Sequence, residues 1–125
     1  MVKNFSLKSV SASAPGKCIL FGEHSVVWGF PAISMGISLK STCTIKEIET
    51  KKIQIDFIDY QKSLEFADLE DLILTIPLQF IHIGTGLNLI VKKYGINIEK
   101  IKISITSSLF PDSGLGSSAS IAVAL

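Results

Sequence analysis

The sequence predicts a mixed α+β domain, and three observations lead to this class. Between residues 8 and 57, apolar residues mostly alternate with polar ones or form short runs, which is typical of strands. Between 69 and 94 the apolar residues recur with helical spacing. An alternating stretch at 101–105 then leads into a glycine-rich turn and a second apolar helix. Strands grouped before a helical region are typical of α+β domains.

The first part of the chain is predicted to form strands separated by turn residues. Residues 8–14 alternate, Pro15-Gly16 interrupts the pattern, and 18–21 form a short apolar run that fits a buried strand. After a turn, residues 32–39 are expected to be extended, with Gly36 at a bulge or a close contact.

A hairpin is predicted next. Residues 41–49 are rich in Thr and Ile, and 53–57 alternate between apolar and polar side chains. The polar residues from Glu49 to Lys52 fit the turn between them, so these strands are expected to pair with one face solvated. Residues 60–67 are polar and show no clear pattern.

The helical region has both start and stop signals. Asp68 fits an N-cap, and Lys92-Lys93 followed by Gly95 fit a C-terminal end. Pro77 is expected to kink the helix, and the stretch 84–86 (Gly-Thr-Gly) is a second candidate break.

The glycine-rich segment 111–120 follows the strand at 101–105 and runs into a helix start. The first N–H groups of a helix have no partner within it, and the helix dipole adds partial positive charge, so such a turn is a ready anion site. Its glycines allow close approach of a ligand to the backbone. On its own, the segment fits an ordinary loop with a serine N-cap equally well.

Composition and charge argue against several classes of protein and of binding partner. The 125 residues suffice for one domain with a core, and 47% hydrophobic against 18% charged residues argues against disorder. The net charge of +1 gives no electrostatic reason to expect a nucleic-acid or membrane partner. Cys18 and Cys43 form no CxxC motif, which predicts buried thiols in a reduced protein, with neither a disulfide framework nor a zinc site.

The protein is expected to be cytoplasmic. The N-terminus lacks the apolar core of a secretory signal. The uncharged stretch 72–91 has nearly the length of a membrane span, but polar residues and Pro77 interrupt it and its apolar residues follow one stripe. The last helix has no stop signal before Leu125, which predicts that residues 1–125 are an N-terminal part of a longer protein.

Three residues near the N-terminus are candidates for chemistry. Lys17 follows a rigid turn, and a lysine beside a phosphate-binding loop neutralises charge on a transferring phosphoryl group. Glu23 and His24 together could bind a hydroxylated substrate or position a phosphate. Taken singly, each also fits a solvated surface position. His82 is interpreted as a structural or surface histidine, and Asp59 as a turn charge.

Other common catalytic motifs are absent from the sequence. It has no GxxxxGK[ST] loop, no GxGxxG after the first strand and no HExxH. The order Gly-Leu-Gly-Ser-Ser at 114–118 is not the G-x-S-x-G elbow of serine hydrolases. The phosphate-binding lysine of any kinase site must therefore lie outside the glycine-rich loop.

Two stretches together resemble a known family. Residues 13–24, followed by 28–32, and the later loop 111–120 are similar in order and content to the first and second motifs of the GHMP small-molecule kinases. Within that family, the run Gly-Glu-His-Ser-Val-Val at 22–27 followed by Gly29 resembles the mevalonate kinases most. The family's fold is a two-layer α+β N-terminal domain with a mixed, mostly antiparallel sheet packed on helices.

The resemblance implies roles for individual residues. The reaction would be ATP- and Mg²⁺-dependent phosphorylation of the primary hydroxyl of mevalonate, an isoprenoid precursor, with Lys17 as a catalytic, nucleotide-contacting residue. Glu23 and His24 would lie on the substrate side, and Ser118 would reach Mg²⁺. The remaining residues implied at ATP are Ser107, Pro111, Asp112, Ser113, Gly114, Leu115, Gly116, Ser117, Ser118 and Ala119.

Two departures from the family pattern affect these expectations. Asp112 stands where the family has Gly, and a carboxylate beside a triphosphate is repulsive unless it points to solvent or meets the metal. The family's acidic base and third motif lie beyond Leu125, so residues 1–125 alone are not expected to phosphorylate mevalonate. The alternatives are a phosphomevalonate or sugar kinase, a non-catalytic nucleotide-binding relative, and a loop that binds nothing. A homodimer is left open.

Overall fold

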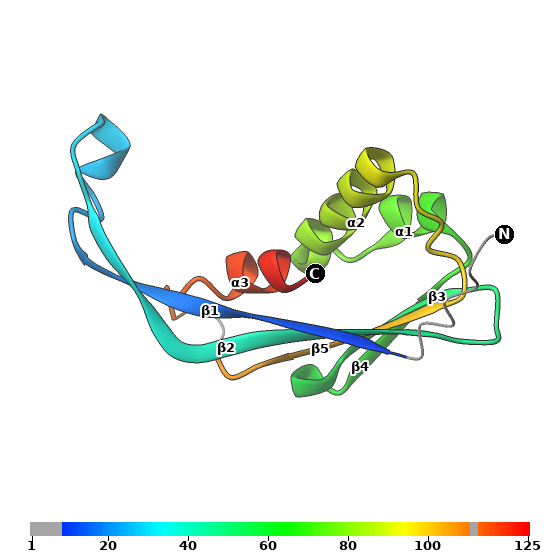
Figure 1. Ribbon diagram of the computed structural model, residues 1–125. Helices are drawn as coiled ribbons and strands as arrows, with labels where there is room; N and C mark the ends of the chain where they lie inside the picture. The colour runs from blue at the N-terminus through cyan, green and yellow to red at the C-terminus, as the bar shows by residue number, and fades with distance from the viewer. Residues whose placement is uncertain (1–8, 111–112) are drawn as a thin grey trace, which may run out of the picture.

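The computed structural model describes residues 9–110 and 113–125, which form a five-stranded sheet with α-helices on one face (Figure 1). This arrangement of two layers confirms the predicted α+β class. The strands are β1 (Val10–Phe21), β2 (Ile33–Glu47), β3 (Ile53–Phe57), β4 (Lys62–Phe66) and β5 (Ile101–Ser107). The helices are α1 (Leu69–Thr75), α2 (Ile81–Tyr94) and α3 (Ser117–Ala124), with short 3-10 turns η1 (Val26–Trp28), η2 (Ile58–Tyr60) and η3 (Leu78–Phe80).

The strand order is β1-β2-β5-β3-β4, and of the neighbouring pairs only β3 and β5 run parallel. The predicted hairpin between 41–49 and 53–57 is therefore wrong, because β5 lies between β2 and β3. Alternation reveals which face of a strand is buried but not which strand is its neighbour. The central position suits β5, whose Ile103 and Ile105 are buried.

Two strands are longer than predicted, because residues expected to interrupt them lie within them. The stretches predicted at 8–14 and 18–21 merge into one strand, β1, over Val10–Phe21, and Pro15-Gly16 produces only a shift in register. Lys8 lies outside the described residues. Since β1 is an edge strand, it tolerates a proline that cannot donate to a ladder. The stretches 32–39 and 41–49 likewise merge into β2. The unassigned stretch 60–67 contains β4, which pairs with β3.

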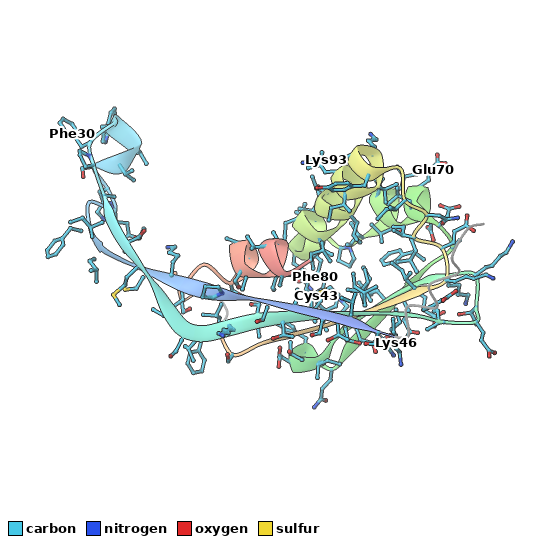
Figure 2. The ribbon with its side chains drawn as sticks, viewed as in Figure 1. Phe30, Cys43, Lys46, Glu70, Phe80 and Lys93 are labelled. Carbon is cyan, nitrogen blue, oxygen red and sulfur yellow. The ribbon has the colours of Figure 1, made fainter. Side chains whose placement is uncertain are left out.

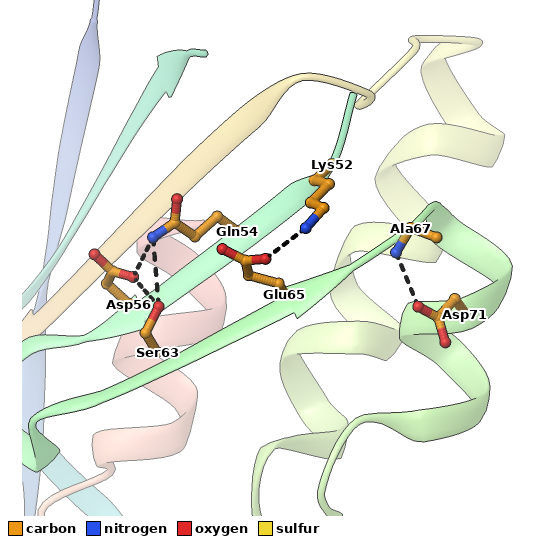
Figure 3. A network of polar contacts seen from close by, with 7 residues as sticks. All are labelled: Lys52, Gln54, Asp56, Ser63, Glu65, Ala67 and Asp71. Carbon is orange, nitrogen blue, oxygen red and sulfur yellow. Dashed lines mark hydrogen bonds and ion pairs between the residues drawn. The ribbon is translucent and has the colours of Figure 1, made fainter. Parts of the chain in front are cut away.

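The helical region begins as predicted. The N–H of Asp71 donates to Oδ1 of Asp68 at 2.9 Å, and Oδ2 of Asp71 accepts from the N–H of Ala67 at 2.8 Å (Figure 3). These two reciprocal bonds satisfy the N–H groups of Asp71 and Ala67 at the helix start.

The helical region is interrupted near Pro77. The helix α1 ends at Thr75, so the proline lies between two helices and does not kink a single one.

The second predicted break, at 84–86, does not occur, because α2 continues through it. Gly84 is buried where α2 passes α1, and a Cβ there would lie 3.1 Å from Cδ2 of Leu72. The glycine thus permits close helix packing rather than a break. Gly95 ends α2 in the left-handed conformation, with φ 62°, as expected.

The core lies between the sheet and the helices, where Cys43 and Phe80 are found (Figure 2). The rings of Phe57 and Phe80 stack there with centroids 3.8 Å apart. The fully buried members are Ile53, Ile55, Leu72, Ile83 and Ile103, each 0% exposed. Both cysteines are free, and burial raises the pKa of Cys43 to about 11.

Polar residues of β3 and β4 form a separate network (Figure 3), which Lys102 of β5 joins. Asp56 pairs with Lys102 and accepts from Ser63 at 2.7 Å and Gln54 at 3.1 Å. Burial alone would raise the pKa of Asp56, but these hydrogen bonds and the charge of Lys102 outweigh it and lower the pKa.

The β1 and β2 strands continue past the helices as an arm (residues 20–35) that carries η1 near its tip (Figure 1). The arm exposes large apolar side chains, among them Phe21, Val27, Trp28 and Phe30. Phe30 lies at the far end of the arm, well away from the core residues Cys43 and Phe80 (Figure 2). Within the described residues, no helix has both the length and the apolar character needed to cross a membrane.

Candidate functional site

Lys17 and the glycine-rich loop meet in the structure, although they are far apart in the sequence. The backbone N–H of Lys17 donates to the carbonyl of Leu115 at 2.8 Å. Its ammonium Nζ donates to the carbonyl of Gly114, also at 2.8 Å. The aliphatic part of Lys17 lies against Gly116, where an added Cβ would be 3.0 Å from Cγ of the lysine. The loop therefore holds the lysine by both its backbone and its side chain.

Glycine is required on both sides of this contact. Gly16 is buried, and a Cβ there would lie 2.8 Å from the carbonyl oxygen of Leu115, a backbone atom that cannot easily move away. Gly114 and Gly116 have φ values of +72° and +76°, which L-residues with a side chain rarely adopt. The predicted glycine-rich turn is thus confirmed as a tight, left-handed loop.

The loop opens directly into α3, with Gly116 as its N-cap. No side chain caps this helix, so the first N–H groups are available to an anion. Ser118 and Ala119 are exposed in the first turn, and Ser113 donates to the carbonyl of Phe110 at 2.6 Å within the loop.

A cavity of about 670 Å³ adjoins the start of α3. Ser107, Ser117 and Ser118, three of the residues expected at a nucleotide, line it, whereas Lys17 does not. The other walls come from η2, the end of β5 and the start of α2. The lining residues are Phe57, Asp59, Tyr60, Gln79, Phe80, His82, Ile83, Ile105, Ser107, Ser108, Leu109, Phe110, Ser117, Ser118 and Ile121.

Asp59 lines this cavity, although the sequence had indicated only a turn charge. Its Oδ2 accepts a hydrogen bond from the N–H of Ser107 at 2.6 Å. The signal that could have found it is topological: β3 and β5 run parallel, so the residues that follow them meet at one edge of the sheet. Because β3 was predicted to pair with the preceding strand, β5 was not expected beside β3.

His82 also faces the cavity from the first turn of α2. Its Nε2 is buried and has no hydrogen-bond partner among the described residues. Burial lowers the pKa of the imidazole, which favours its neutral form.

The two substrate-side candidates lie elsewhere. Glu23 and His24 are exposed in the turn that begins the arm, six and seven positions beyond Lys17 in the chain. In residues 9–110 and 113–125, no hydrogen bond or ion pair joins either of them to the loop. Pro111 and Asp112 lie outside the described residues, so the position of the Asp112 carboxylate stays an open expectation.

The arrangement combines the parts that a phosphate-binding site needs. Three kinds of group that favour negative charge lie around one loop. They are the ammonium of Lys17, the free N–H groups at the start of α3, and the hydroxyls of Ser117 and Ser118. Among the described residues that line the cavity, Asp59 supplies the one carboxylate. The described residues contain no cluster of three His, Cys, Asp or Glu side chains that could hold a metal ion. The groups beside the loop therefore suit an anion.

Comparisons with known protein families and with known relatives agree. The family model described as "GHMP kinases N terminal domain" matches residues 81–125 of this chain. The chain is 38% identical over 122 residues to a mevalonate kinase of Pyrococcus furiosus, a match that covers 92% of this chain and 36% of that protein. The chain thus spans about a third of the length of the curated relatives it matches.

Solved structures agree with the fold. The crystal structure of the Methanococcus jannaschii mevalonate kinase superposes with a TM-score of 0.82 at 36% identity, over 92% of this chain and 37% of that one. A Lactococcus lactis galactokinase, solved with galactose, has a TM-score of 0.75 at 25% identity, over 94% of this chain and 31% of that one. All three relatives are kinases that act on small molecules.

Proposed function

Because this chain belongs to the GHMP kinase family, we propose that it carries the ATP-phosphate-binding part of a mevalonate kinase. The reaction is transfer of the γ-phosphoryl group of ATP to the primary hydroxyl of mevalonate, a step toward isoprenoid precursors, in the cytoplasm. The mevalonate kinases among its relatives favour this substrate over others in the family.

The contact between Lys17 and the loop carries the proposal. The Lys17 ammonium lies 2.8 Å from the Gly114 carbonyl, which places its charge beside the loop on which a phosphate would bind. The nearby N–H groups of α3 would hold the phosphate oxygens, and the ammonium would stabilise the charge that develops during transfer. The cavity beside Ser107 has room for the nucleoside.

Mg²⁺ fits the site only together with a nucleotide. Ser118 offers one hydroxyl at the helix start, and Mg²⁺ commonly binds through few protein oxygens, waters and substrate phosphates. When bound, the ion would neutralise phosphate charge. The protein groups named here bind and orient the phosphates.

The rest of the reaction needs residues that the described site lacks. Glu23 and His24 are proposed to contact mevalonate from the base of the arm. The chain spans about 36% of its relatives' length, and no described carboxylate contacts the loop as a base for the substrate hydroxyl. Residues 1–125 alone are therefore proposed to bind ATP without phosphorylating mevalonate.

The test is mevalonate-dependent ADP release by the full-length protein, with Lys17→Ala and Lys46→Ala compared. Removing one group that stabilises transition-state charge typically lowers kcat by about 10²–10³, and Lys17→Ala should fall in that range. Lys46 is an exposed lysine of β2, so its loss should change little. Full activity of Lys17→Ala would contradict the assigned role.

A sugar kinase is the main alternative, since a galactokinase shares the fold. ADP release measured with mevalonate, phosphomevalonate and galactose separates the candidates. ATP binding without turnover on any of them would instead favour a non-catalytic nucleotide-binding relative, and no ATP binding at all would contradict both.

A further inference from the structure

Three serine hydroxyls connect the cavity with the start of α3 through the interior of the protein. Oγ of Ser107 lies 2.9 Å from Oγ of Ser41, which lies 2.6 Å from Oγ of Ser120. Ser41 is 0% and Ser120 3% exposed. Neither of them lines the cavity, but both contact groups that do, because the chain of bonds begins at Ser107 and ends at the carbonyl of Ser117.

The direction of every bond in this chain follows from its two ends. The carbonyl of Ser117 can only accept, so the hydroxyl of Ser120 donates to it at 2.8 Å. A serine hydroxyl has one proton, and Ser41 must therefore donate to Ser120. By the same argument, Ser107 donates to Ser41.

Ser107 consequently has no donor left for the cavity. Its hydroxyl proton points inward to Ser41, and its backbone N–H is bound to Oδ2 of Asp59 at 2.6 Å. One lone pair of its Oγ accepts from the N–H of Leu109 at 3.2 Å, which leaves one lone pair free. Beside it, Asp59 supplies a carboxylate, which only accepts when ionised.

We propose that Ser41 and Ser120 are positioning residues of the nucleotide site: by holding the Ser107 proton inside the protein, they make Ser107 and Asp59 an acceptor-only edge. Such an edge binds hydrogen-bond donors of the nucleoside, either the ribose hydroxyl pair or the amino group of the base. It repels phosphate, which is left to Lys17 and the start of α3. The inference rests on the proposed binding of ATP and adds to it which part of the nucleotide this edge recognises.

The experiment compares three nucleotides with the full-length protein: ATP, 2′,3′-dideoxy-ATP, which lacks both ribose hydroxyls, and purine riboside triphosphate, which lacks the amino group. A hydrogen bond to a charged acceptor is worth about a tenfold change in binding. One of the two analogues should therefore lose about that factor in kcat/KM with the wild type. Which analogue loses affinity identifies the donor.

Ser41→Ala should reduce this discrimination to about threefold or less, because the freed Ser107 hydroxyl can then donate as well as accept. KM for ATP should rise while kcat stays near the wild-type value, since the phosphate contacts are untouched. Ser120→Ala should act in the same direction, because Ser41 loses its acceptor. Ser11→Ala is the matched control: it removes a serine–threonine hydroxyl contact on β1, with Thr44 at 3.0 Å, outside the chain of bonds.

Two results would overturn the inference. One is a wild-type protein whose kcat/KM for each analogue equals its kcat/KM for ATP. This measurement needs no buried variant, so it stands even if those variants fail to fold. The other is full discrimination in folded Ser41→Ala and Ser120→Ala. If mevalonate is not phosphorylated, calorimetric titration with the same three nucleotides tests the edge by itself, so failure of the kinase proposal is distinguished from failure of this one.

Discussion

The ammonium of Lys17 donates to the carbonyl of Gly114 across 97 positions of sequence, at 2.8 Å. This bond joins the first strand to the loop before the last described helix. The lysine is thereby kept extended along the loop, with its charge beside the place where free helix N–H groups begin. Both parts of the proposed phosphate site depend on the close approach of β1 to the loop.

Gly16→Ala should break this approach. The added Cβ would lie 2.8 Å from the Leu115 carbonyl, so the loop must move and the Lys17 N–H bond to that carbonyl must lengthen. Overpacking of this kind destabilises by about 1–3 kcal/mol. Gly36→Ala, on the strand paired with Lys17, meets open space and is the control. Urea unfolding and ATP titration should both separate the two variants, and equal behaviour would contradict the contact.

The ion pair between Asp56 and Lys102 should matter more than the one between Lys52 and Glu65. The first pair is mostly buried, with side chains 17% and 23% exposed, and the second is about half exposed. Lys102→Met should lower the free energy of unfolding by about 1–2 kcal/mol, because Asp56 loses a charged partner. Lys52→Met should lower it less, since solvent screens that pair. Chemical denaturation at pH 7 would measure both, and a larger loss at Lys52 would contradict the prediction.

The pH dependence of Asp56 has a definite sign. Its folded-state pKa is lowered, so the stability it contributes is present above its ordinary pKa and is lost as pH falls through the folded value. Wild type should therefore lose more stability between pH 5 and pH 3 than Lys102→Met does. Parallel curves for the two proteins would show that the pair is not formed.

Cys43 should make the protein less stable at high pH. Its pKa rises to about 11 in the folded state from an ordinary value of 9.0, so its contribution is complete below pH 9 and is lost as pH rises toward 11. Between pH 8 and pH 10.5 the loss should be about 2 kcal/mol. Cys43→Ala should lack this part of the decline in urea unfolding. In the same folded protein, alkylation with iodoacetamide should modify the partly exposed Cys18 before the buried Cys43.

His82 should act in the opposite direction. Burial lowers its pKa, so the stability it contributes is present above the ordinary histidine pKa and is lost as pH falls through the lower folded value. Wild type should therefore lose more stability between pH 7 and pH 5 than His82→Met, which keeps the volume without the charge. His24→Met, at an exposed position, controls for the loss of a histidine. Thermal unfolding across this range would show the difference, and identical slopes for wild type and His82→Met would rule it out.

Local patterns were reliable where local physics decides the outcome. The Asp68 cap and the left-handed Gly95 were predicted, because each depends on a few neighbouring residues. Pro77 was predicted to kink the helix, whereas α1 ends before it at Thr75. The predicted helix break at Gly84 was wrong, because this glycine makes room for Leu72 of another helix. A glycine in a sequence does not reveal whether it serves a turn or a close contact.

The sequence by itself determined the fold class, the two motifs and the position of the glycine-rich loop before a helix. These features follow from periodicity, from the conformational freedom of glycine and from residue order. Only the tertiary structure decided that β5 separates β2 from β3, since alternation does not name a strand's neighbour. That arrangement places Asp59 against Ser107 and Ser41 opposite Ser107, while α3 brings Ser120 to Ser41. The direction of their hydrogen bonds could not be read from the chain, because it depends on which donors and acceptors the fold brings within 3 Å of each other.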